Sequence, residues 1–445
     1  MKPLVVISCP IDTFSGYGGR ARDLVLPLIK SGKYDVKILP QRWGNTPWGF
    51  LQKDNPDHKL ILDCILDSPQ LPKQPDCWIQ HTVPNEFQPI GKFNIGITAG
   101  IETTVCAPQW IDGLNRMNLN LVSSTFAKKV FQDSRFEKRN NQTNQIEEII
   151  ELKAPIEVLF EGIDTNIYKV PSKISLEGIN TEILNKFTGE LSNVIDDLVK
   201  EEFNFLYIGH WLQGELGQDR KDTGMLIKTF LETFKGKKSK PGLILKTTSV
   251  GYSIMDREEI LDRIRKIQEA VGNDLPNIYL LHGGLEDKEI NELYNHPKVK
   301  AHVSFTKGEG YGRPLLEASL SQKPVIASNW SGHTDFLNEG MSILLPGEIT
   351  PVHPSAQVQD MILPESKWFT VDYKKASDIL EDVFKNYKKY TDGAKRQAYR
   401  SRTEFNLEKM AEKFLNILEE KIPKSVELKL PQLKKIELPK LKKVE

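Results

Sequence analysis

Two glutamates and a glycine-rich turn in the segment Ser304–Ala318 have the residue types that could bind a sugar joined to a diphosphate. The segment predicts a strand, a turn and a helix with proline near its first position. Backbone N–H groups at a helix start attract anions, and glycines let a diphosphate approach the chain closely. Glu309 lies in the turn, and Glu317 lies about two turns into the helix on nearly the same face. This arrangement suits a nucleotide-sugar, although the spacing of the glutamates alone would fit ordinary surface charges.

The elements that must position these residues begin with an alternation of short apolar runs and helical patterns. Such alternation predicts βαβ units and a mostly parallel sheet. A glycine-rich turn at residues 15–19 separates the first strand from a helix over residues 20–29. The strands predicted in this part of the chain are residues 4–8, 36–39, 77–80, 93–97, 120–123 and, closing the domain, 156–160.

The alternation starts again at residue 203 and predicts a second doubly wound α/β domain. Its predicted strands are residues 203–209, 242–246, 278–281, 301–304 and 324–327. We therefore expect an N-terminal Rossmann-like domain over residues 1–168, completed by a C-terminal helix at 404–421, and a second one over 169–403. Ligands of such sheets bind outside the carboxyl ends of the strands, so the cleft between the domains is the expected site.

Three segments fall outside this alternation. A polar insert at residues 137–145 predicts an exposed loop, and residues 169–201 predict a helical, charged connector. Residues 422–445 have prolines eight residues apart and an excess of lysine, which predicts an extended tail because proline interrupts helices. The tail is either a solvated end or a strand that docks on a partner.

The composition is that of a folded protein without a global field. Of the 445 residues, 39% are hydrophobic and 27% are charged, and the formal net charge is zero. This length suits two domains, and the charge gives no overall attraction to nucleic acid or to an anionic membrane. No stretch approaches the roughly eighteen apolar residues of a membrane helix, so we expect no stable membrane insertion. Four scattered cysteines without a CxxC pair predict reduced thiols and a cytoplasmic protein.

The block from Ser304 to Asp335 resembles the donor site of the large GT-B glycosyltransferase family usually numbered 4. Residues 158–168 resemble the hinge of that family, with Glu161 where Asn is usual, and Val122–Phe131 resembles the segment before it. The resemblance covers most of residues 1–420. It implies the GT-B fold, in which two doubly wound Rossmann-like domains, acceptor and donor, face each other across a cleft. It also implies a retaining enzyme whose substrate is a nucleotide-sugar donor, a UDP- or GDP-sugar.

The resemblance implies roles for the charged residues of the second domain. A basic pair neutralises the leaving diphosphate in the family; here His210 stands where the pair usually begins, and the basic residues come later as Arg220 and Lys221. Two fixed cations would stabilise the charge that grows on the diphosphate, whereas the alternative is a solvated Asp-Arg-Lys-Asp turn. The counterpart of Glu309 touches the transferred sugar, and the counterpart of Glu317 holds the ribose.

Smaller residues and the first domain complete the implied site. Gly18 and Gly19 belong to a turn that faces the donor sugar in the family, and without a GxGxxG pattern we expect no dinucleotide site there. His81 ends a strand and is either the family's residue near the reacting sugar or a structural histidine. Glu102 also ends a strand, and we expect it to position the acceptor. The remaining donor-binding residues implied by the resemblance are Gly310, Tyr311 and Gly312.

No cofactor other than the donor substrate is expected. The sequence has no Asp-x-Asp after a strand, no cluster with metal-ligand spacing and no nucleophile elbow. We therefore expect a metal-independent sugar transfer that depends on positioning and electrostatic stabilisation. The acceptor stays open between a glycan, a metabolite, a protein and a modified DNA base. A second hypothesis is a catalytically idle GT-B binding module that docks a partner through its basic tail, although the intact charged residues of the implied site disfavour it.

Overall fold

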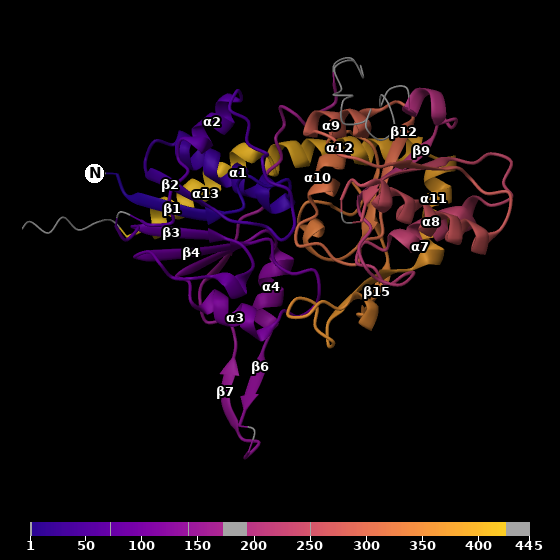
Figure 1. Cartoon of the computed structure of the whole chain (residues 1–445). Coiled ribbons are helices and arrows are strands. Elements are labelled where there is room, and N and C mark those ends of the chain that lie inside the picture. Colours follow the sequence, from indigo (N-terminus) through magenta and orange to yellow (C-terminus); the bar gives the residue numbers. More distant parts are fainter. Residues whose placement is uncertain (1, 72, 141, 172–193, 250, 424–445) are drawn as a thin grey trace, which may run out of the picture.

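The computed structural model describes residues 2–71, 73–140, 142–171, 194–249 and 251–423. Two α/β domains lie side by side, each built on a six-stranded sheet (Figure 1). The predicted fold class of two doubly wound Rossmann-like domains is confirmed. Most of the predicted connector and nearly all of the predicted tail lie outside the described residues.

The first sheet has the strand order β2-β1-β3-β4-β5-β8, and all its strands are parallel. Its central strands are buried on both faces, which is why they could be recognised as nearly continuous apolar runs. The strands are β1 (Leu4–Cys9), β2 (Asp35–Pro40), β3 (Cys77–His81), β4 (Phe93–Thr98), β5 (Leu119–Val122) and β8 (Ile156–Val158).

Helices cover both faces of the first sheet. They are α1 (Gly16–Lys30), α2 (Pro56–Leu62), α3 (Pro108–Asn115), α4 (Thr125–Asp133) and, from the far end of the chain, α13 (Leu407–Lys421). The Ser15 side chain caps α1 by accepting a hydrogen bond from the N–H of Gly18. Met410 and Phe414 of α13 are fully buried in the same core as β1. The C-terminal helix is therefore part of the first domain (Figure 1).

The second sheet has the order β11-β10-β9-β12-β13-β14 and is also parallel. Its strands are β9 (Asn204–His210), β10 (Gly242–Thr248), β11 (Ile278–Leu281), β12 (Val299–Ser304), β13 (Val325–Ser328) and β14 (Ile343–Leu345). The sequence did not predict the last of these, a three-residue strand at the edge of the sheet. The helices are α7 (Thr223–Phe234), α8 (Ile254–Val271), α9 (Asp287–Asn295), α10 (Arg313–Ser319), α11 (Tyr373–Lys385) and α12 (Lys388–Glu404).

Two small antiparallel sheets are added to this plan. β6 (Phe136–Arg139) and β7 (Ile146–Ile150) form a hairpin that projects from the first domain (Figure 1). The predicted loop at 137–145 is thus only the end of this hairpin, and the prediction is wrong for residues 137–139. Both faces of these strands are largely exposed, so no apolar alternation marks them. In the second domain, β15 (Gly347–Pro351) pairs with β16 (Lys367–Val371).

The four cysteines are free thiols, and Cys9, Cys77 and Cys106 are buried. Burial raises the pKa of the Cys106 thiol to about 11, so this side chain is protonated at neutral pH. Among the helices of the described residues, none combines the length and the apolar composition that a membrane crossing requires.

Candidate functional site

The predicted cations and the predicted turn glutamate meet in the second domain. Arg220 and Lys221 lie in the loop after β9, and Glu309 lies in the turn after β12. β9 and β12 are neighbours and run parallel, so their carboxyl ends lie at the same edge of the sheet. The loops that follow them are therefore brought into contact.

The Glu309 carboxylate is the centre of this contact. Lys221 Nζ forms an ion pair with its Oε1, Arg220 Nη1 lies 3.4 Å from its Oε2, and the Thr306 hydroxyl donates a hydrogen bond of 2.8 Å to Oε1. Burial opposes ionisation of this carboxyl, but the two cations outweigh it and lower its pKa to about 2. Glu309 is therefore an anion at neutral pH and a poor proton donor.

The loop that carries the cations is not a solvated turn. Asp219 and Asp222 are fully buried, and the side chains of Arg220 and Lys221 are only 18% and 12% exposed. Asp222 Oδ2 lies 3.2 Å from the buried Lys307 Nζ. The solvated-turn alternative for the sequence Asp-Arg-Lys-Asp is therefore wrong.

Contacts of Lys307 and Asp222 hold the loop of Arg220 and Lys221 in place. The Tyr373 hydroxyl donates to Asp222 Oδ2 at 2.7 Å, and the backbone N–H of Lys307 donates to the carbonyl of Arg220 at 2.8 Å. Asp222 itself has φ 52°, in the left-handed region. The sequence analysis did not identify Lys307, Asp222 or Tyr373. The paired acids around Arg220 and Lys221 were a signal for Asp222, but nothing in their sequence surroundings marks Lys307 or Tyr373 as its partners.

The glycines of the turn after β12 allow the two domains to come into close contact. A Cβ on Gly308 would lie 1.9 Å from the carbonyl oxygen of Glu102, and one on Gly310 would lie 2.5 Å from that of Ala99. The hydroxyl of Ser124 donates to the carbonyl of Gly310 at 2.6 Å. The sequence interpretation assigned the glycines to close approach of a diphosphate, whereas in the structure Gly308 and Gly310 allow close approach of the first domain.

Gly312 and Tyr311 have different surroundings. Gly312 has φ 95° and is the N-cap residue of α10. We call Arg220, Lys221 and Glu309 the charged cluster. A Cβ on Gly312 would lie 3.5 Å from Cγ of Glu309, so Gly312 adjoins this cluster. Tyr311 is buried, with its ring 5.0 Å from that of Phe336. Tyr311 is therefore a core side chain of the second domain.

Glu317 is separate from the cluster around Glu309. Its Oε1 lies 3.3 Å from Arg313 Nε, and its Oε2 lies 3.4 Å from the Tyr294 hydroxyl. Burial raises the pKa of Glu317 to about 7, although Arg313 opposes the shift. Arg313 also reaches Asp23 of α1, at 2.8 Å, and so links the two domains. Across the described ranges, no ion pair or hydrogen bond joins Glu317 to Arg220 or Lys221.

The first domain contributes Glu102 to the charged cluster. Arg220 Nη1 lies 3.9 Å from Glu102 Oε1, so this predicted acceptor residue faces the predicted phosphate-binding cation. The loop that carries Glu102 is also fixed to the second domain, since the N–H of Thr104 donates to the carbonyl of Lys367 at 2.9 Å.

His81 is buried at the end of β3. Its Nδ1 lies 3.2 Å from the carbonyl of Ile97, and its ring stacks on Tyr17 with centroids 4.8 Å apart. Burial lowers the pKa of His81 to about 4, so the ring is neutral at neutral pH. A narrow space beside it is lined by Arg20, Thr98, Ser123 and Glu161 among others. The buried, neutral ring of His81 therefore fits a structural histidine better than a side chain that faces solvent.

The two glycines at the start of α1 differ in position. A Cβ on Gly18 would lie 2.4 Å from the carbonyl oxygen of Thr13, so Gly18 closes the first turn of α1 against its own domain. A Cβ on Gly19 would lie 3.6 Å from Arg313 Nη1, so Gly19 faces the second domain.

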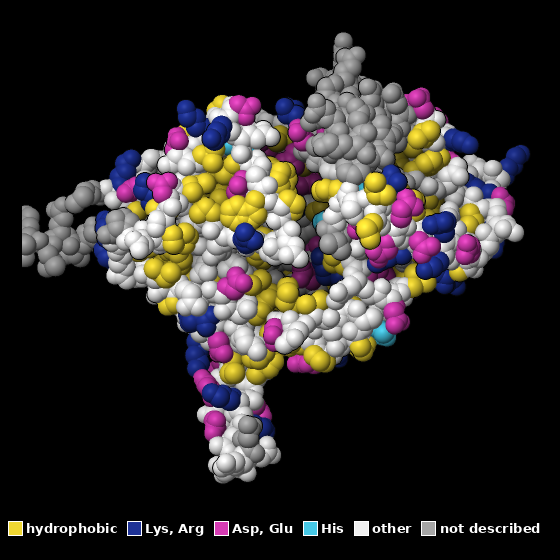
Figure 2. All heavy atoms as spheres, in the orientation of Figure 1, with side chains coloured by type: hydrophobic (Ala, Val, Ile, Leu, Met, Phe, Trp, Pro, Cys, Tyr) yellow, Lys and Arg dark blue, Asp and Glu magenta, His cyan; other side chains and the backbone are white. Residues whose placement is uncertain are grey.

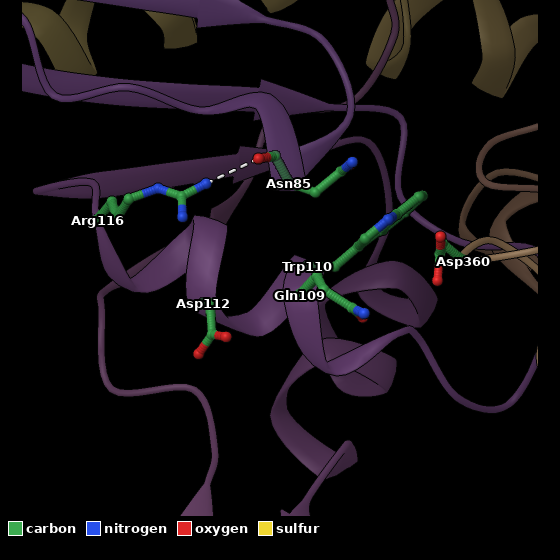
Figure 3. Close-up of a pocket in the computed structure, with 6 residues that line it drawn as sticks. All are labelled: Asn85, Gln109, Trp110, Asp112, Arg116 and Asp360. Atoms are coloured by element: carbon green, nitrogen blue, oxygen red, sulfur yellow. Dashed lines mark hydrogen bonds between the residues drawn. The ribbon is translucent and has the colours of Figure 1, made fainter.

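A separate hollow of about 320 Å³ lies between α3 and the loop that joins β15 to β16 (Figure 3). Its polar lining from both domains comprises Asn85, Gln109, Asp112, Arg116 and Asp360, beside Trp110. The guanidinium of Arg116 points to the carbonyl of Asn85 and donates to it at 2.8 Å. None of the predicted site residues lines this hollow.

Metal ligands are not clustered in the described part of the chain. No group of three or more His, Cys, Asp or Glu side chains there has an arrangement that could hold a metal ion.

Part of the second domain matches a known protein family. Residues 254–361 match the family model described as "Glycosyl transferases group 1". The matched segment includes Glu309 and Glu317 and ends before β16, but it does not reach back to Arg220 and Lys221. No curated protein matches the sequence.

Several solved structures share the two-domain fold. One is HepE from Anabaena in complex with UDP and glucose, with 12% identity and a TM-score of 0.59 over 94% of this chain and 100% of that one. Another is sucrose-phosphate synthase from Thermosynechococcus elongatus, with 12% identity and a TM-score of 0.59 over 94% and 99%. A third is a glycosyltransferase from Rickettsia africae, with 13% identity and a TM-score of 0.56 over 94% and 98%.

The architecture is therefore the GT-B fold. Together with the matched segment at 254–361, it supports a transferase enzyme of the GT-B glycosyltransferase class.

Proposed function

We propose that this chain is a retaining glycosyltransferase, similar to family 4, that moves a hexose-like sugar from a nucleoside-diphosphate sugar to an acceptor hydroxyl without a metal ion. The observation that carries the proposal is the meeting of Arg220, Lys221 and Glu309 at the carboxyl ends of β9 and β12. Ligands of doubly wound sheets bind at this edge.

The proposed contribution of Arg220, Lys221 and Glu309 to the reaction is electrostatic. As the bond to the sugar breaks, negative charge grows on the diphosphate, and cations that are already fixed in place stabilise it without reorganisation. Arg220 and Lys221 are fixed by their pairing with Glu309 and by the buried anchor beneath them. Glu309, an anion with a pKa of about 2, contributes charge and position and no proton. The leaving phosphate then accepts the proton of the acceptor hydroxyl on the same face of the sugar.

Two further assignments belong to the proposal. HepE has been solved with UDP and with UDP-glucose, which supports a UDP-sugar as the first donor to test, with a GDP-sugar as the alternative. Glu102, beside Arg220, is proposed to position the acceptor. The four free thiols support a reducing, cytoplasmic location.

The direct test is hydrolysis of UDP-, GDP- and ADP-sugars without an acceptor. Release of one nucleoside diphosphate well above the uncatalysed rate supports the proposal and identifies the donor. Binding without any turnover, with or without acceptors, would instead favour the idle binding module. That alternative depends on the tail, which from residue 424 lies outside the described residues.

Chelation tests the metal-free part of the proposal. Because the described residues contain no ligand cluster and two cations lie at the site, UDP is expected to bind equally well with and without EDTA. Calorimetric titrations of the same protein sample, before and after chelation, measure this. A large loss of affinity that added Mg²⁺ or Mn²⁺ restores would contradict it.

Replacing Glu317 and replacing Glu309 with Ala are expected to change different kinetic quantities. Glu317→Ala should chiefly weaken nucleotide binding, by about tenfold, since its proposed role is to hold the ribose. Glu309→Ala should chiefly lower kcat, since it lies on the two cations that stabilise developing charge. Exposed Glu348→Ala on β15 is the control for both. Near-normal kinetics in both site variants would place the donor site elsewhere.

A further inference from the structure

The first domain presents a cluster of aromatic side chains on the loops after β1 and β2. Phe14 and Trp48 are 55% and 44% exposed, and Trp43 and Phe50 beside them are half-buried. We call these four residues the aromatic platform. Figure 2 shows hydrophobic side chains gathered over the α1 and α2 part of the first domain, beside the furrow between the domains. Rigid exposed rings in such a place are a mark of a binding surface.

The platform is held in place by its own loops. The Asp12 carboxylate accepts hydrogen bonds from the N–H groups of Gly49 and Leu51, at 3.3 and 2.8 Å. The N–H of Phe14 donates to the carbonyl of Pro47 at 3.2 Å, which joins the two loops. The rings of Phe14 and Phe50 meet edge to face at 5.2 Å. Such preorganisation lowers the entropic cost of binding.

A partly buried side chain of α1 supports the platform. The guanidinium of Arg22 lies 3.4 Å from the centre of the Phe50 ring and donates to the carbonyls of Ile11 and Thr13, at 2.9 and 3.1 Å. Arg22 belongs to α1, the helix that follows the first of the two loops. The platform is thereby tied to the N-terminal half of α1.

The platform continues toward the charged cluster through stacked rings. Trp43 stacks on Tyr17 with centroids 3.8 Å apart, and Tyr17 stacks in turn on His81 at 4.8 Å. Tyr17 lies in the first turn of α1, and Asp23 of the same helix pairs with Arg313 of the donor domain. The platform therefore lies on the side of the first domain that meets the second.

The charges around the platform select the kind of ligand. The two loops, residues 11–15 and 41–55, contain two basic residues, Arg42 and Lys53, and two aspartates, Asp12 and Asp54, so they have no net charge. Polyanions such as DNA are bound chiefly by an excess of lysine and arginine, which is missing here. A membrane surface would also require basic residues beside the apolar ones. Flat rings with a negative face suit instead the C–H faces of neutral sugar rings.

We propose that the aromatic platform binds a neutral carbohydrate, so that the acceptor of the transfer is a glycan. The rings of Trp48 and Phe14 stack on sugar units away from the reacting end. Trp43 and Tyr17 lie along the path of the glycan from these units to the charged cluster. This inference rests on the proposed function, because it names the acceptor of that reaction.

Direct binding measurements test it without any donor. Saturation-transfer NMR on the full chain would use neutral tetrasaccharides of glucose, galactose, mannose and N-acetylglucosamine, and a single-stranded DNA oligonucleotide as the polyanion. At least one tetrasaccharide is expected to bind, and Trp48→Ala should weaken it about tenfold while Trp48→Phe retains most of the affinity. Tyr399→Ala, which removes an aromatic side chain that is 64% exposed on α12, is the matched control and should change nothing.

The outcomes are separable. No tetrasaccharide binding, binding that survives Trp48→Ala, or DNA binding that depends on Trp48 would each overturn the proposal. UDP binding, measured on the same variants, should be unchanged because Trp48 lies outside the charged cluster. If the unsubstituted chain binds no nucleotide-sugar, the proposed function fails while the carbohydrate result still stands or falls on its own. Thermal melting of each variant shows that the fold is retained.

Discussion

Replacing both Arg220 and Lys221 with Ala is expected to lower turnover of the donor by at least about a thousandfold. Loss of a single group that stabilises developing charge costs roughly a hundredfold to a thousandfold in kcat, and here two such groups act on one diphosphate. Both are held on Glu309 in a setting that is mostly buried, where water screens their charges poorly. Initial rates of donor hydrolysis and of sugar transfer measure the effect.

The chain offers a matched control for this variant. Arg265 and Lys266 stand side by side on α8 and are 62% and 73% exposed, so replacing both with Ala removes the same charges from the surface. Kinetics should then be unchanged, since exposed ion pairs contribute little. Some loss of stability is expected in the site variant because Glu309 is left buried without its cations. Adding Glu309→Gln removes that charge, and the melting temperature should recover while turnover stays low.

Partial restoration distinguishes charge from geometry. Arg220→Lys combined with Lys221→Ala should recover part of the rate, because a cation is present again but the guanidinium contact with the Gly308 carbonyl, at 2.8 Å, is lost. Unchanged turnover in the double Ala variant would mean that other cations bind the diphosphate. Lys246 and Arg313 would then be the candidates, although each already has a partner, the Gly283 carbonyl for the first and Asp23 and Glu317 for the second.

The two sheets could be predicted from the sequence because their strands are buried on both faces. A run such as that of β10, buried from Gly242 to Thr248, leaves a nearly continuous apolar signal. β6 and β7 have no such signal, since solvent surrounds most of their side chains. β14 was missed because three residues at a sheet edge carry too little pattern.

The charged cluster was predicted less completely than the fold. Glu309 could be named because it lies in a glycine-rich turn between a strand and a helix, and Arg220 and Lys221 were named from the resemblance to the family, whose basic pair neutralises a diphosphate. Their separation from Glu317 depends on the direction of α10, which spacing alone does not reveal. Gly308 and Gly310 are defined by contacts with Glu102 and Ala99, about 200 residues away, and no local pattern encodes such contacts.

The largest loss of stability is expected when the buried ion pair of Asp222 and Lys307, which holds the loop of Arg220 and Lys221, is broken. Asp222→Asn keeps a residue that tolerates φ 52° but removes the carboxylate charge 3.2 Å from the buried Lys307 Nζ. That ammonium then lies beside neutral acceptors such as the Thr370 hydroxyl, at 2.9 Å. Breaking a buried ion pair on one side typically costs about 3–5 kcal/mol in the free energy of unfolding. Denaturant unfolding measures this loss. The pH should lie above the value of about 7 to which burial raises the pKa of Asp222, so that its carboxylate is ionised.

The second half of the experiment removes both charges. Asp222→Asn with Lys307→Met eliminates the unpaired ammonium, so most of the stability should return, and the double-mutant cycle gives the coupling of the pair. Turnover should stay reduced, because the loop of Arg220 and Lys221 has lost the side-chain contact that positions it next to Glu309. Asp262→Asn with Lys266→Met, an exposed pair on α8, should cost less than about 1 kcal/mol. An Asp222→Asn protein that unfolds like the unsubstituted chain would show that the loop is anchored by its backbone alone, through the bond from the Lys307 N–H to the Arg220 carbonyl.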